Sequence, residues 1–380
     1  MKQIFYLGGY ASEEVAYRKP AAGYNASSNK MNYIVSLLKN AGHHVIIVAY
    51  YHGTVSGINR RIISKVDDRE VRWFLPCIDI LHGPLRKLTG ISSKLSILWA
   101  LCRIPKSSIL LVYNANIYAR MIQTLNRFKH FDVILDVEEV QYYYLQGKER
   151  ARAKFIEEKM YTLASKYIVV NDLIYERFLD NNKPYMVLYG NYTAQCKISE
   201  KNTDGRIHVI FSGSIDRIRG ADRAVAAANY LPDSYCLHIT GGGQSNVVAE
   251  IANEAERINQ NAGYEKVILH GQLPMQELDA LVQSMHIGLN LQDVNNPFEA
   301  VSFPSKIAFY FAHGLNVVSS RMSSVEASRI SDRLSYYDGN DPKEIAAAIQ
   351  RTHILTFEEN VSVLEELDRI AKKDAERIFA

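Results

Sequence analysis

The sequence has few cysteines and lacks the histidine spacings of common metal sites. Four cysteines, Cys77, Cys102, Cys196 and Cys236, lie far apart in the 380 residues and form no CxxC pair. The 11 histidines show no HxxxH or HExxH spacing. We therefore expect reduced core thiols in a cytosolic protein, with neither a disulfide framework nor a metal site.

The chain also lacks a strong charge of one sign and a long apolar run. Its formal net charge is +3 at pH 7, which is too weak to indicate nucleic-acid binding. No apolar segment is long enough to span a bilayer, and residues 1–9 lead directly into a strand-like pattern without the features of a signal peptide. These absences predict a cytoplasmic location.

What the sequence contains is typical of a soluble globular protein. Hydrophobic residues make up 47% of the chain and charged residues 22%, close to the average for such proteins. A chain of 380 residues is too long for one compact core, so two domains of ordinary size are expected.

The first half of the chain begins with a βαβ pattern. A strand over 3–7 is followed by Gly8-Gly9, a helix over 29–41 with Ser28 as its predicted cap, and a strand over 44–49. Such a unit predicts a parallel sheet with right-handed crossovers. Further strands are predicted over 108–113, 133–137 and 167–170, and further helices over 119–128, 150–164 and 172–179.

A polar stretch between 189 and 206 predicts a linker, after which a second βα series begins. Its strands are predicted over 207–211, 236–239, 267–269 and 287–291, and its helices over 221–230, 275–284 and 342–351. Thr356 and Glu359 form a capping box before a final helix. The whole pattern predicts two successive doubly wound α/β domains.

Residues 299–320 carry the most informative functional pattern. A short loop with Glu299 and Lys306 leads into an apolar segment over 307–312, a glycine stop and a β-branched run, which is one αβ step of a doubly wound domain. Near strand ends and helix N-termini, a lysine suits a phosphate and a carboxylate suits sugar hydroxyls. The alternative interpretation is a solvated loop of any α/β protein.

Glycine-rich turns follow strands in both halves of the chain. They are Gly8-Gly9, Gly213 and Gly241-Gly242-Gly243. Turns of this kind offer backbone N–H groups to a diphosphate. Two α/β domains bind ligands beyond the carboxyl ends of their strands, so we expect the site in a cleft between the domains.

Four segments of the second half occur in a characteristic order. They are Phe211-Ser-Gly-Ser-Ile-Asp-Arg-Ile-Arg-Gly220, Gly241-Gly-Gly243, His270-Gly271 and Glu299…Pro304-Ser-Lys306…Ala312-His-Gly314-Leu-Asn-Val-Val318. Their order and spacing resemble the GT-B glycosyltransferases of family 4. In the first half, Asp136-Val-Glu-Glu139 is similar to the D-x-x-E segments of members that build bacterial capsule and O-antigen polysaccharides.

The chain departs from the family pattern at three places. Ser214 stands where the family has its first diphosphate arginine, so the resemblance assigns that charge to Arg217 or Arg219, and Arg219 falls at the family's lysine position. Phe309 stands where the family has the glutamate that usually holds the nucleotide ribose. No second carboxylate follows at the E-x7-E spacing, since Ile307 occupies that place.

The resemblance implies two facing Rossmann-like domains and a retaining transfer from a nucleotide-diphosphate sugar, most often a UDP-sugar, to a saccharide or lipid-linked acceptor in cell-surface polysaccharide synthesis. Domains are expected over 1–190 for the acceptor and 206–355 for the donor, with helix 356–380 returning to the first domain. Basic side chains take the place of a metal, and no cofactor beyond the donor is expected. The implied catalytic residues are Glu299, Lys306 and Arg219.

The remaining implied contacts fall into two groups. The diphosphate would lie against Gly213, Ser214, Arg217, Arg219, Gly241, Gly242, Pro304, Ser305 and Lys306. Sugar and acceptor would lie against Gly8, Gly9, Asp136, Glu138, Glu139 and Glu299. For Asp136, Glu138 and Glu139 the alternative is an acidic cluster at a helix N-terminus, which the helix macrodipole favours.

Three other functions remain open at this point. A GT-B-fold sugar-nucleotide epimerase would use the same nucleotide pocket, although the pattern over 304–318 favours the transferase. A two-domain solute-binding protein would close on its ligand, which the absence of a signal peptide argues against. A catalytically inactive partner subunit of a saccharide assembly complex is compatible with Phe309 in place of glutamate.

A segment over 85–103 mixes basic and apolar residues. Arg86, Lys87, Lys94 and Arg103 alternate with Leu88, Ile91, Leu95, Leu98 and Trp99, and Arg60, Arg61 and Lys65 lie on a nearby stretch. Basic residues beside an apolar stripe attract anionic headgroups, so a peripheral contact at the inner face of the cell membrane is one expectation. The other is an ordinary helix that packs Leu95, Leu98 and Trp99 on its own sheet.

Overall fold

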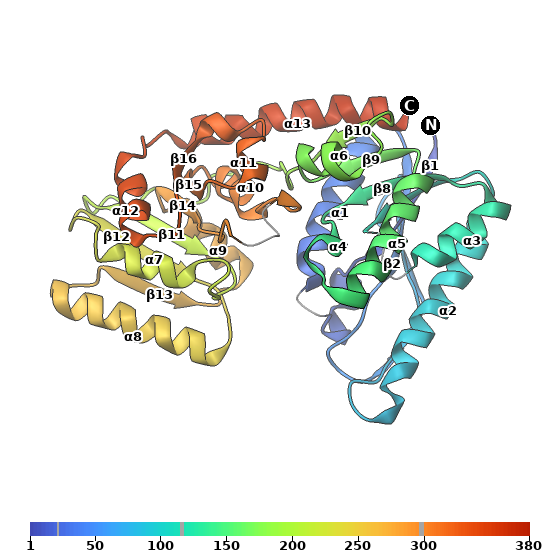
Figure 1. The fold of residues 1–380 in the computed structure, drawn as a ribbon, viewed down its shortest axis with the longest axis horizontal. Coiled ribbons are helices and arrows are strands. Elements are labelled where there is room, and N and C mark those ends of the chain that lie inside the picture. The colour runs from blue at the N-terminus through green and yellow to red at the C-terminus, as the bar shows by residue number, and fades with distance from the viewer. Residues whose placement is uncertain (21–22, 115–117, 296–299) are drawn as a thin grey trace. The chain divides into compact units, whose positions relative to one another are not determined.

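The computed structural model describes residues 1–380 except 21–22, 115–117 and 296–299, and for residues 23–26 it describes the backbone alone. The chain divides into two compact units (Figure 1). The first comprises Met1–Leu188 together with Ile370–Ala380, and the second comprises Tyr189–Arg369. Each is an α/β layered structure built on its own sheet, so the prediction of two Rossmann-like α/β domains is confirmed.

The first unit contains an eight-stranded sheet in the order β10-β9-β8-β7-β1-β2-β5-β4. All neighbouring strands are parallel except β4 and β5. The central strands are almost continuously apolar and buried, as expected of a parallel sheet covered on both faces. The strands are β1 (Gln3–Gly9), β2 (His44–Tyr50), β4 (Ile62–Lys65), β5 (Glu70–Phe74), β7 (Ile109–Tyr113), β8 (Asp132–Val137), β9 (Lys166–Val169) and β10 (Tyr185–Val187).

Helices of the first unit connect these strands. They are α1 (Gly23–Asn40), α2 (Lys87–Arg103), α3 (Ala119–Lys129), α4 (Gln141–Tyr144), α5 (Gly147–Leu163) and α6 (Asp172–Phe178). The prediction that Ser28 caps the first helix is wrong, because α1 already begins at Gly23. Ser28 lies within the helix, and its hydroxyl accepts a hydrogen bond from the Ala11 backbone N–H at 3.0 Å.

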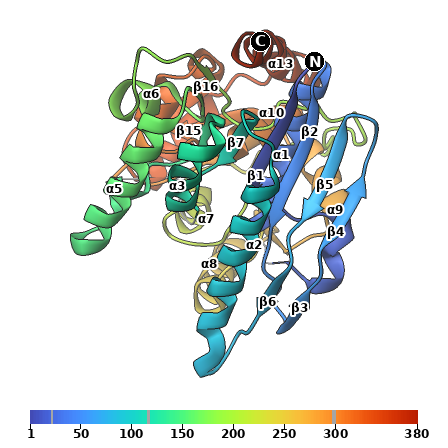
Figure 2. The ribbon, with the colours of Figure 1, turned by 90° about the vertical axis from the view of Figure 1, so that its right-hand side faces the viewer.

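A short antiparallel pair, β3 (Gly57–Asn59) and β6 (Cys77–Asp79), lies outside the large sheet. Helix α2 follows β6 and runs beside it (Figure 2). Side chains of α2 hold β6 in place: the Ser92 hydroxyl accepts from Ile78 N–H at 3.0 Å, and the Thr89 hydroxyl accepts from Ile80 N–H at 2.8 Å. This pairing was not predicted from the sequence, because its strands are only three residues long.

The second unit contains a six-stranded, wholly parallel sheet in the order β13-β12-β11-β14-β15-β16. Its strands are β11 (Ile207–Ser212), β12 (Tyr235–Thr240), β13 (Val267–Gly271), β14 (Ile287–Asn290), β15 (Asn316–Ser320) and β16 (Leu334–Tyr337). Its helices are α7 (Ala221–Ala228), α8 (Ser245–Ala262), α9 (Met275–Gln283), α10 (Ser305–Ala312), α11 (Ser323–Glu326) and α12 (Pro342–Arg351).

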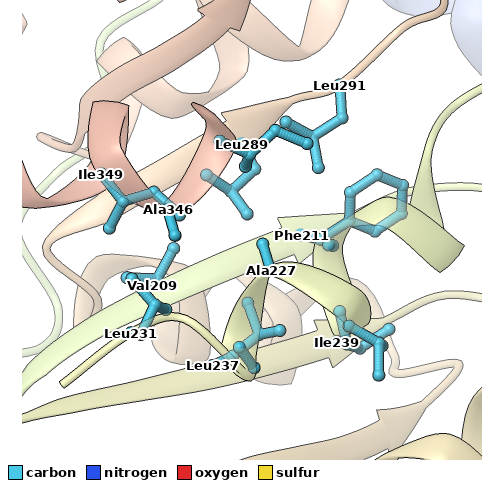
Figure 3. Packing of buried hydrophobic residues seen from close by; sticks show 14 of the residues in the cluster. Val209, Phe211, Ala227, Leu231, Leu237, Ile239, Leu289, Leu291, Ala346 and Ile349 are labelled. Carbon is cyan, nitrogen blue, oxygen red and sulfur yellow. The ribbon is translucent and has the colours of Figure 1, made fainter. Parts of the chain in front are cut away.

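One apolar cluster of the second unit lies on a single face of this sheet (Figure 3). Val209 and Phe211 of β11 and Leu237 and Ile239 of β12 point to the same side, since alternate strand residues share a face. Small alanines of α7 and α12 close over them and allow close helix-to-sheet contact. The residues that alternate with them, such as His208 and His238, consequently point to the opposite face.

The last helix, α13 (Phe357–Phe379), begins in the second unit and ends in the first. Its start is the predicted capping box, in which the Glu359 carboxylate accepts from Thr356 N–H at 2.8 Å and the Thr356 hydroxyl accepts from Glu359 N–H at 3.2 Å. At its other end the Lys166 ammonium donates to the Ile378 carbonyl. Its apolar face is buried at Leu364 and Ile378.

Candidate functional site

The sheet of the second unit reverses its strand order between β11 and β14. From β11 the chain proceeds outward through β12 and β13, then crosses to β14 and proceeds the other way. In open parallel sheets, ligands bind beyond the carboxyl ends of the strands at such a switch point. The turns after β11 and β12 and the start of α10 all meet at this edge.

Two glycine turns pack against each other at the carboxyl ends of β11 and β12. Gly213 and Gly241 both have φ of 139°, a conformation that side chains disfavour. A Cβ on Gly241 would lie 1.8 Å from the Gly213 carbonyl oxygen. A Cβ on Gly243 would lie 2.2 Å from the Ile215 carbonyl oxygen. The glycines are therefore required for the close approach of the two loops, whatever ligand they bind.

Tyr310 of α10 holds the end of β11 just before the Gly213 turn. Its hydroxyl accepts a hydrogen bond from Ser212 N–H at 2.9 Å and lies 3.3 Å from the Leu289 carbonyl. The ring fills the space above Gly288, where a Cβ would meet ring carbons at 2.3 Å. Helix α10 is thereby fixed against the end of β11, with its N-terminus at the glycine turns.

Lys306 is the second residue of α10, which begins at Ser305, so the prediction that Lys306 belongs to the preceding loop is wrong. Part of the side chain is accessible, but its ammonium nitrogen is buried and has no hydrogen-bond partner among the described residues. The nitrogen lies 4.1 Å from the centre of the Phe211 ring, a cation–π contact. A Cβ built on Gly213 would lie 3.4 Å from this nitrogen.

The environment of Lys306 favours its neutral form. Burial, followed by the nearby Arg219, lowers the pKa of Lys306 to about 7, against a smaller opposing effect of Asp216. The side-chain nitrogen of Lys306 thus lies beside the glycine turn without a hydrogen-bond partner among the described residues.

The two arginines of the loop after β11 have different partners. Arg219 forms an ion pair with Asp216 at 2.7 Å and remains half exposed. Arg217 forms an ion pair with Glu250 of α8 at 2.9 Å and is more exposed. Of these two arginines, only Arg219 contributes to the lowered pKa of Lys306.

The remaining residues predicted for the diphosphate lie around the same turns. Ser214 and Gly242 are exposed, and Pro304 and Ser305 form the cap and first residue of α10. Glu299 lies outside the described residues. Phe309 packs against the His313 ring at a centroid distance of 4.3 Å, and His313 pairs with Asp279 at 2.9 Å. Phe309, which stands where the resembled family has its second glutamate, therefore makes an aromatic contact.

In the first unit, Asp136 is fully buried within β8 and does not begin a helix as the alternative interpretation required. Its two oxygens accept from the Tyr6 hydroxyl at 2.6 Å and from the Lys30 ammonium at 2.9 Å. Lys30 also pairs with Glu138, which is only partly buried. Two carboxylates thus share one ammonium at the carboxyl end of β8.

The backbone next to this cluster takes a left-handed conformation that is uncommon outside glycine. Asn114, at the end of β7, has φ of 41°, and its side-chain oxygen accepts from Glu138 N–H at 3.0 Å. Such conformations cost free energy and often occur at functional sites. Glu139 accepts from the Gln141 side chain at 3.2 Å.

The glycines predicted for the first unit lie in the strand itself. Gly8 and Gly9 are the last two residues of β1, and a Cβ on Gly8 would lie 2.8 Å from the Met31 sulfur. Gly8 is therefore explained by the packing of α1 on β1.

Solved structures resemble the whole chain. A sucrose-phosphate synthase from Thermosynechococcus elongatus is 14% identical with a TM-score of 0.62, covering 100% of this chain and 95% of that one. The E. coli trehalose-6-phosphate structure bound with UDP-2-fluoro glucose is 11% identical with a TM-score of 0.69, covering 100% and 98%. A UDP-forming trehalose-phosphate synthase from Burkholderia vietnamiensis is 10% identical with a TM-score of 0.64, covering 98% and 94%.

The chain has the GT-B fold. At these identities the likeness establishes the architecture alone. No family model and no curated protein matches the sequence. Within the GT-B fold, the first unit carries the Asp136–Lys30 cluster and the second carries the Lys306 turn.

Sequence reasoning missed three side chains that build these sites. Lys30 and Tyr6 hold Asp136, and Tyr310 supports the Gly213 turn. The sequence did contain a signal for Lys30. This lysine lies on the same helix face as Ile34, which is buried, and a charged side chain on a buried face needs a partner. Tyr310 gave no such signal, because an aromatic residue is ordinary in an apolar helix.

Proposed function

We propose that the protein transfers a sugar from a nucleotide-diphosphate sugar to a saccharide acceptor. The observation that carries this proposal is the buried Lys306 ammonium without a partner among the described residues. Burying an unpaired charge is costly. A diphosphate bound at the Gly213 turn would supply the missing negative charge and the hydrogen-bond acceptors.

The same arrangement supports the chemistry of transfer. When the bond between sugar and diphosphate breaks, negative charge develops on the leaving diphosphate, and preorganised cations lower the barrier. Lys306 and Arg219 would meet this charge, with Gly213, Ser214, Gly241 and Gly242 leaving room for the phosphates. Arg219 would exchange its pairing with Asp216 for the diphosphate. We propose retention of the anomeric configuration, as the resemblance to family 4 implies.

We further propose UDP as the nucleotide. Two of the structures with the same fold are a UDP-forming synthase and a complex with UDP-2-fluoro glucose. Glu299 and Pro304–Lys306 would surround the donor. Phe309 cannot accept hydrogen bonds from a ribose, so ribose recognition would depend on other groups. An assay must therefore distinguish the transferase from an inactive partner subunit and from an epimerase.

The acceptor is proposed to lie at the carboxyl end of the first sheet, near Glu138 and Glu139. Both carboxylates are partly accessible, and carboxylates bind sugar hydroxyls well. Asp136 is too deeply buried for direct contact and would act through Lys30, which it holds beside Glu138. A saccharide or lipid-linked saccharide of cell-surface polysaccharide synthesis is the proposed class of acceptor.

A lipid-linked acceptor would bring the protein to a membrane. Leu88, Ile91 and Leu95 of α2 are exposed, Ile91 by 52% and Leu95 by 61%, so the expectation that Leu95 packs on the sheet is wrong. Exposed lysines at Lys87 and Lys94 flank them. No helix of the described residues is long and apolar enough to cross a membrane. We propose that this α2 surface lies on anionic lipid.

Release of nucleotide from a panel of nucleotide sugars tests the function. Slow release of UDP from one UDP-sugar, faster with an added saccharide acceptor, is the expected result. An epimerase would convert the sugar without releasing nucleotide. Binding of UDP without either reaction would indicate an inactive partner subunit, and absence of binding by all nucleotides would contradict the proposal.

A further inference from the structure

The face of the second sheet opposite the apolar cluster of Figure 3 carries two histidines and a cysteine, here called the HCH cluster: His208, Cys236 and His238. His208 on β11 lies directly across from Cys236 on β12, and His238 is two residues further along β12. All three are buried, with at most 5% exposure. One ligand atom of each lies within 4.8 Å of the others.

Further polar groups hold the two imidazoles from outside. His208 Nε2 is 2.9 Å from the Asp204 carboxylate, and His238 Nδ1 is 2.9 Å from His270 Nε2. The remaining nitrogens, His208 Nδ1 and His238 Nε2, face each other at 2.8 Å. Each ring thus has one nitrogen fixed by an outer partner and one directed into the cluster, beside the Cys236 thiol.

We propose that the HCH cluster binds a divalent transition-metal ion of the zinc class through His208 Nδ1, His238 Nε2 and Cys236 Sγ. Imidazole and thiolate are the ligands that zinc prefers, and three protein ligands leave a fourth position for water or a backbone carbonyl. Metal-bound histidines characteristically donate their other N–H to a carboxylate or similar acceptor. Asp204 and His270 occupy these outer positions.

Metal binding requires the three ligand atoms, which lie within 4.8 Å of one another, to take up tetrahedral positions, and it requires protons to move. Tetrahedral ligands at zinc–nitrogen distances of about 2.0 Å are about 3.3 Å apart, so the two rings would separate slightly. If His208 Nε2–H donates to Asp204, then His238 Nε2–H donates to His208 Nδ1 and His270 Nε2–H donates to His238 Nδ1. On metal binding the His238 proton moves from Nε2 to Nδ1, and the His270 proton moves from Nε2 to Nδ1. Cys236 loses its thiol proton to solvent. One proton is therefore released for each metal ion bound.

The burial of the HCH cluster favours a structural ion, because its three side chains lie within the strands and away from solvent. His208 and Cys236 are the second residues of β11 and β12, and His238 lies three residues before Gly241. A metal there would join β11 to β12 and stabilise the second unit. The inference is independent of the proposed transferase function. Searches for helical histidine spacings miss it, because its Cys236-Leu-His238 spacing has the period of a strand.

A second cluster, His52, Cys77 and Asp79, has similar spacing and supplies a control. There the Asp79 oxygens already accept hydrogen bonds from Gly53 N–H at 2.8 Å and the Asn59 side chain at 2.7 Å, and lie 2.8 Å from His52 Nδ1. This cluster contains one imidazole, whereas the HCH cluster contains two, and its carboxylate is held by three neighbouring groups. Cys77→Ser is therefore the matched counterpart of Cys236→Ser.

The experiment is titration of the chelator-treated, full-length protein with Co²⁺, followed by displacement with Zn²⁺. We expect thiolate-to-cobalt charge-transfer absorption that saturates at one equivalent, and a higher melting temperature with Zn²⁺. Cys236→Ser should abolish the absorption and Cys77→Ser should retain it. Asp204→Asn should weaken Zn²⁺ binding by about 10- to 100-fold.

Two results would overturn the proposal. One is the absence of both the absorption and the Zn²⁺-dependent stabilisation in the unsubstituted protein, which decides the question even if Cys236→Ser fails to fold. The other is absorption that survives Cys236→Ser and disappears in Cys77→Ser.

Discussion

At the scale of single residues, Lys306 and Glu157 show how burial changes the charge that a side chain prefers. Both are held in surroundings that favour the neutral form, Lys306 beside the Gly213 turn and Glu157 in α5 of the first unit. For Lys306 the consequence concerns ligand binding, and for Glu157 it concerns stability.

UDP binding should take up protons through Lys306. The pKa of Lys306 is about 7 without ligand, and a bound diphosphate favours the charged form and raises it. Affinity should therefore fall as pH rises above 7, by up to about tenfold per pH unit. Calorimetry between pH 7 and 9, in buffers of different ionisation enthalpy, measures both effects. Lys306→Arg keeps its charge and should show little pH dependence. Equal affinity of the unsubstituted protein across this range would contradict the assignment.

Glu157 should make the protein less stable as pH rises. Burial raises the pKa of Glu157 to about 7 from its ordinary value, 4.5. The folded state therefore keeps a proton that the unfolded state releases. This stabilisation is complete below about pH 4.5 and is lost as pH rises through 7, by at most about 3 kcal/mol.

Glu157→Gln should melt higher than the unsubstituted protein at pH 8.5 and similarly at pH 4.5. The exposed neighbour gives the control, Glu158→Gln, which should leave the pH profile unchanged. A Glu157→Gln profile parallel to that of the unsubstituted protein would refute this account.

At the scale of helices and strands, the close packing of the two glycine turns requires glycine whether or not a ligand is bound. This requirement can be tested by measuring stability alone. Gly241→Ala should lower the free energy of unfolding by about 2 kcal/mol or more, because the backbone has φ of 139° and the new Cβ would meet the Gly213 carbonyl. Gly90→Ala is the matched control. Gly90 lies within α2 with nothing within 4 Å of a Cβ, so this change should stabilise by about 1 kcal/mol. Chemical denaturation measures both, and equal effects would contradict the proposed packing.

The long elements were predictable from sequence and the short ones were not. The pattern over 119–128 predicted α3 to within a residue, since its apolar spacing is regular. The β3–β6 pair and β16 were missed, because three or four residues carry too little periodicity. The glycine turns and Lys306 were found from their order along the chain. The pairing of Arg219 with Asp216 and of Asp136 with Lys30 depends on tertiary packing, which spacing along the chain does not reveal.

At the scale of the whole molecule, each unit of the GT-B fold carries one candidate site, and the exposed α2 surface belongs to the first unit. If this surface binds lipid, full-length protein should sediment with vesicles that contain anionic lipid and much less with neutral vesicles. Leu88→Ser with Ile91→Ser should reduce this binding several-fold without loss of stability, since both side chains are already exposed. Ile198→Ser, at an exposed site in the second unit, is the control. Equal, negligible sedimentation with both vesicle types would contradict the membrane proposal and leave the transferase proposal untouched.

The central claim is that the Gly213 turn and Lys306 hold a nucleotide diphosphate, and calorimetric titration with UDP tests it most directly. Each charge-assisted phosphate contact contributes roughly 1.5–3 kcal/mol. Lys306→Ala should therefore weaken UDP binding by about one to two decades, Arg219→Ala should weaken it as well, and Lys343→Ala on α12 should leave it unchanged. UDP affinity that is the same in the unsubstituted protein, Lys306→Ala and Arg219→Ala would contradict the proposed site.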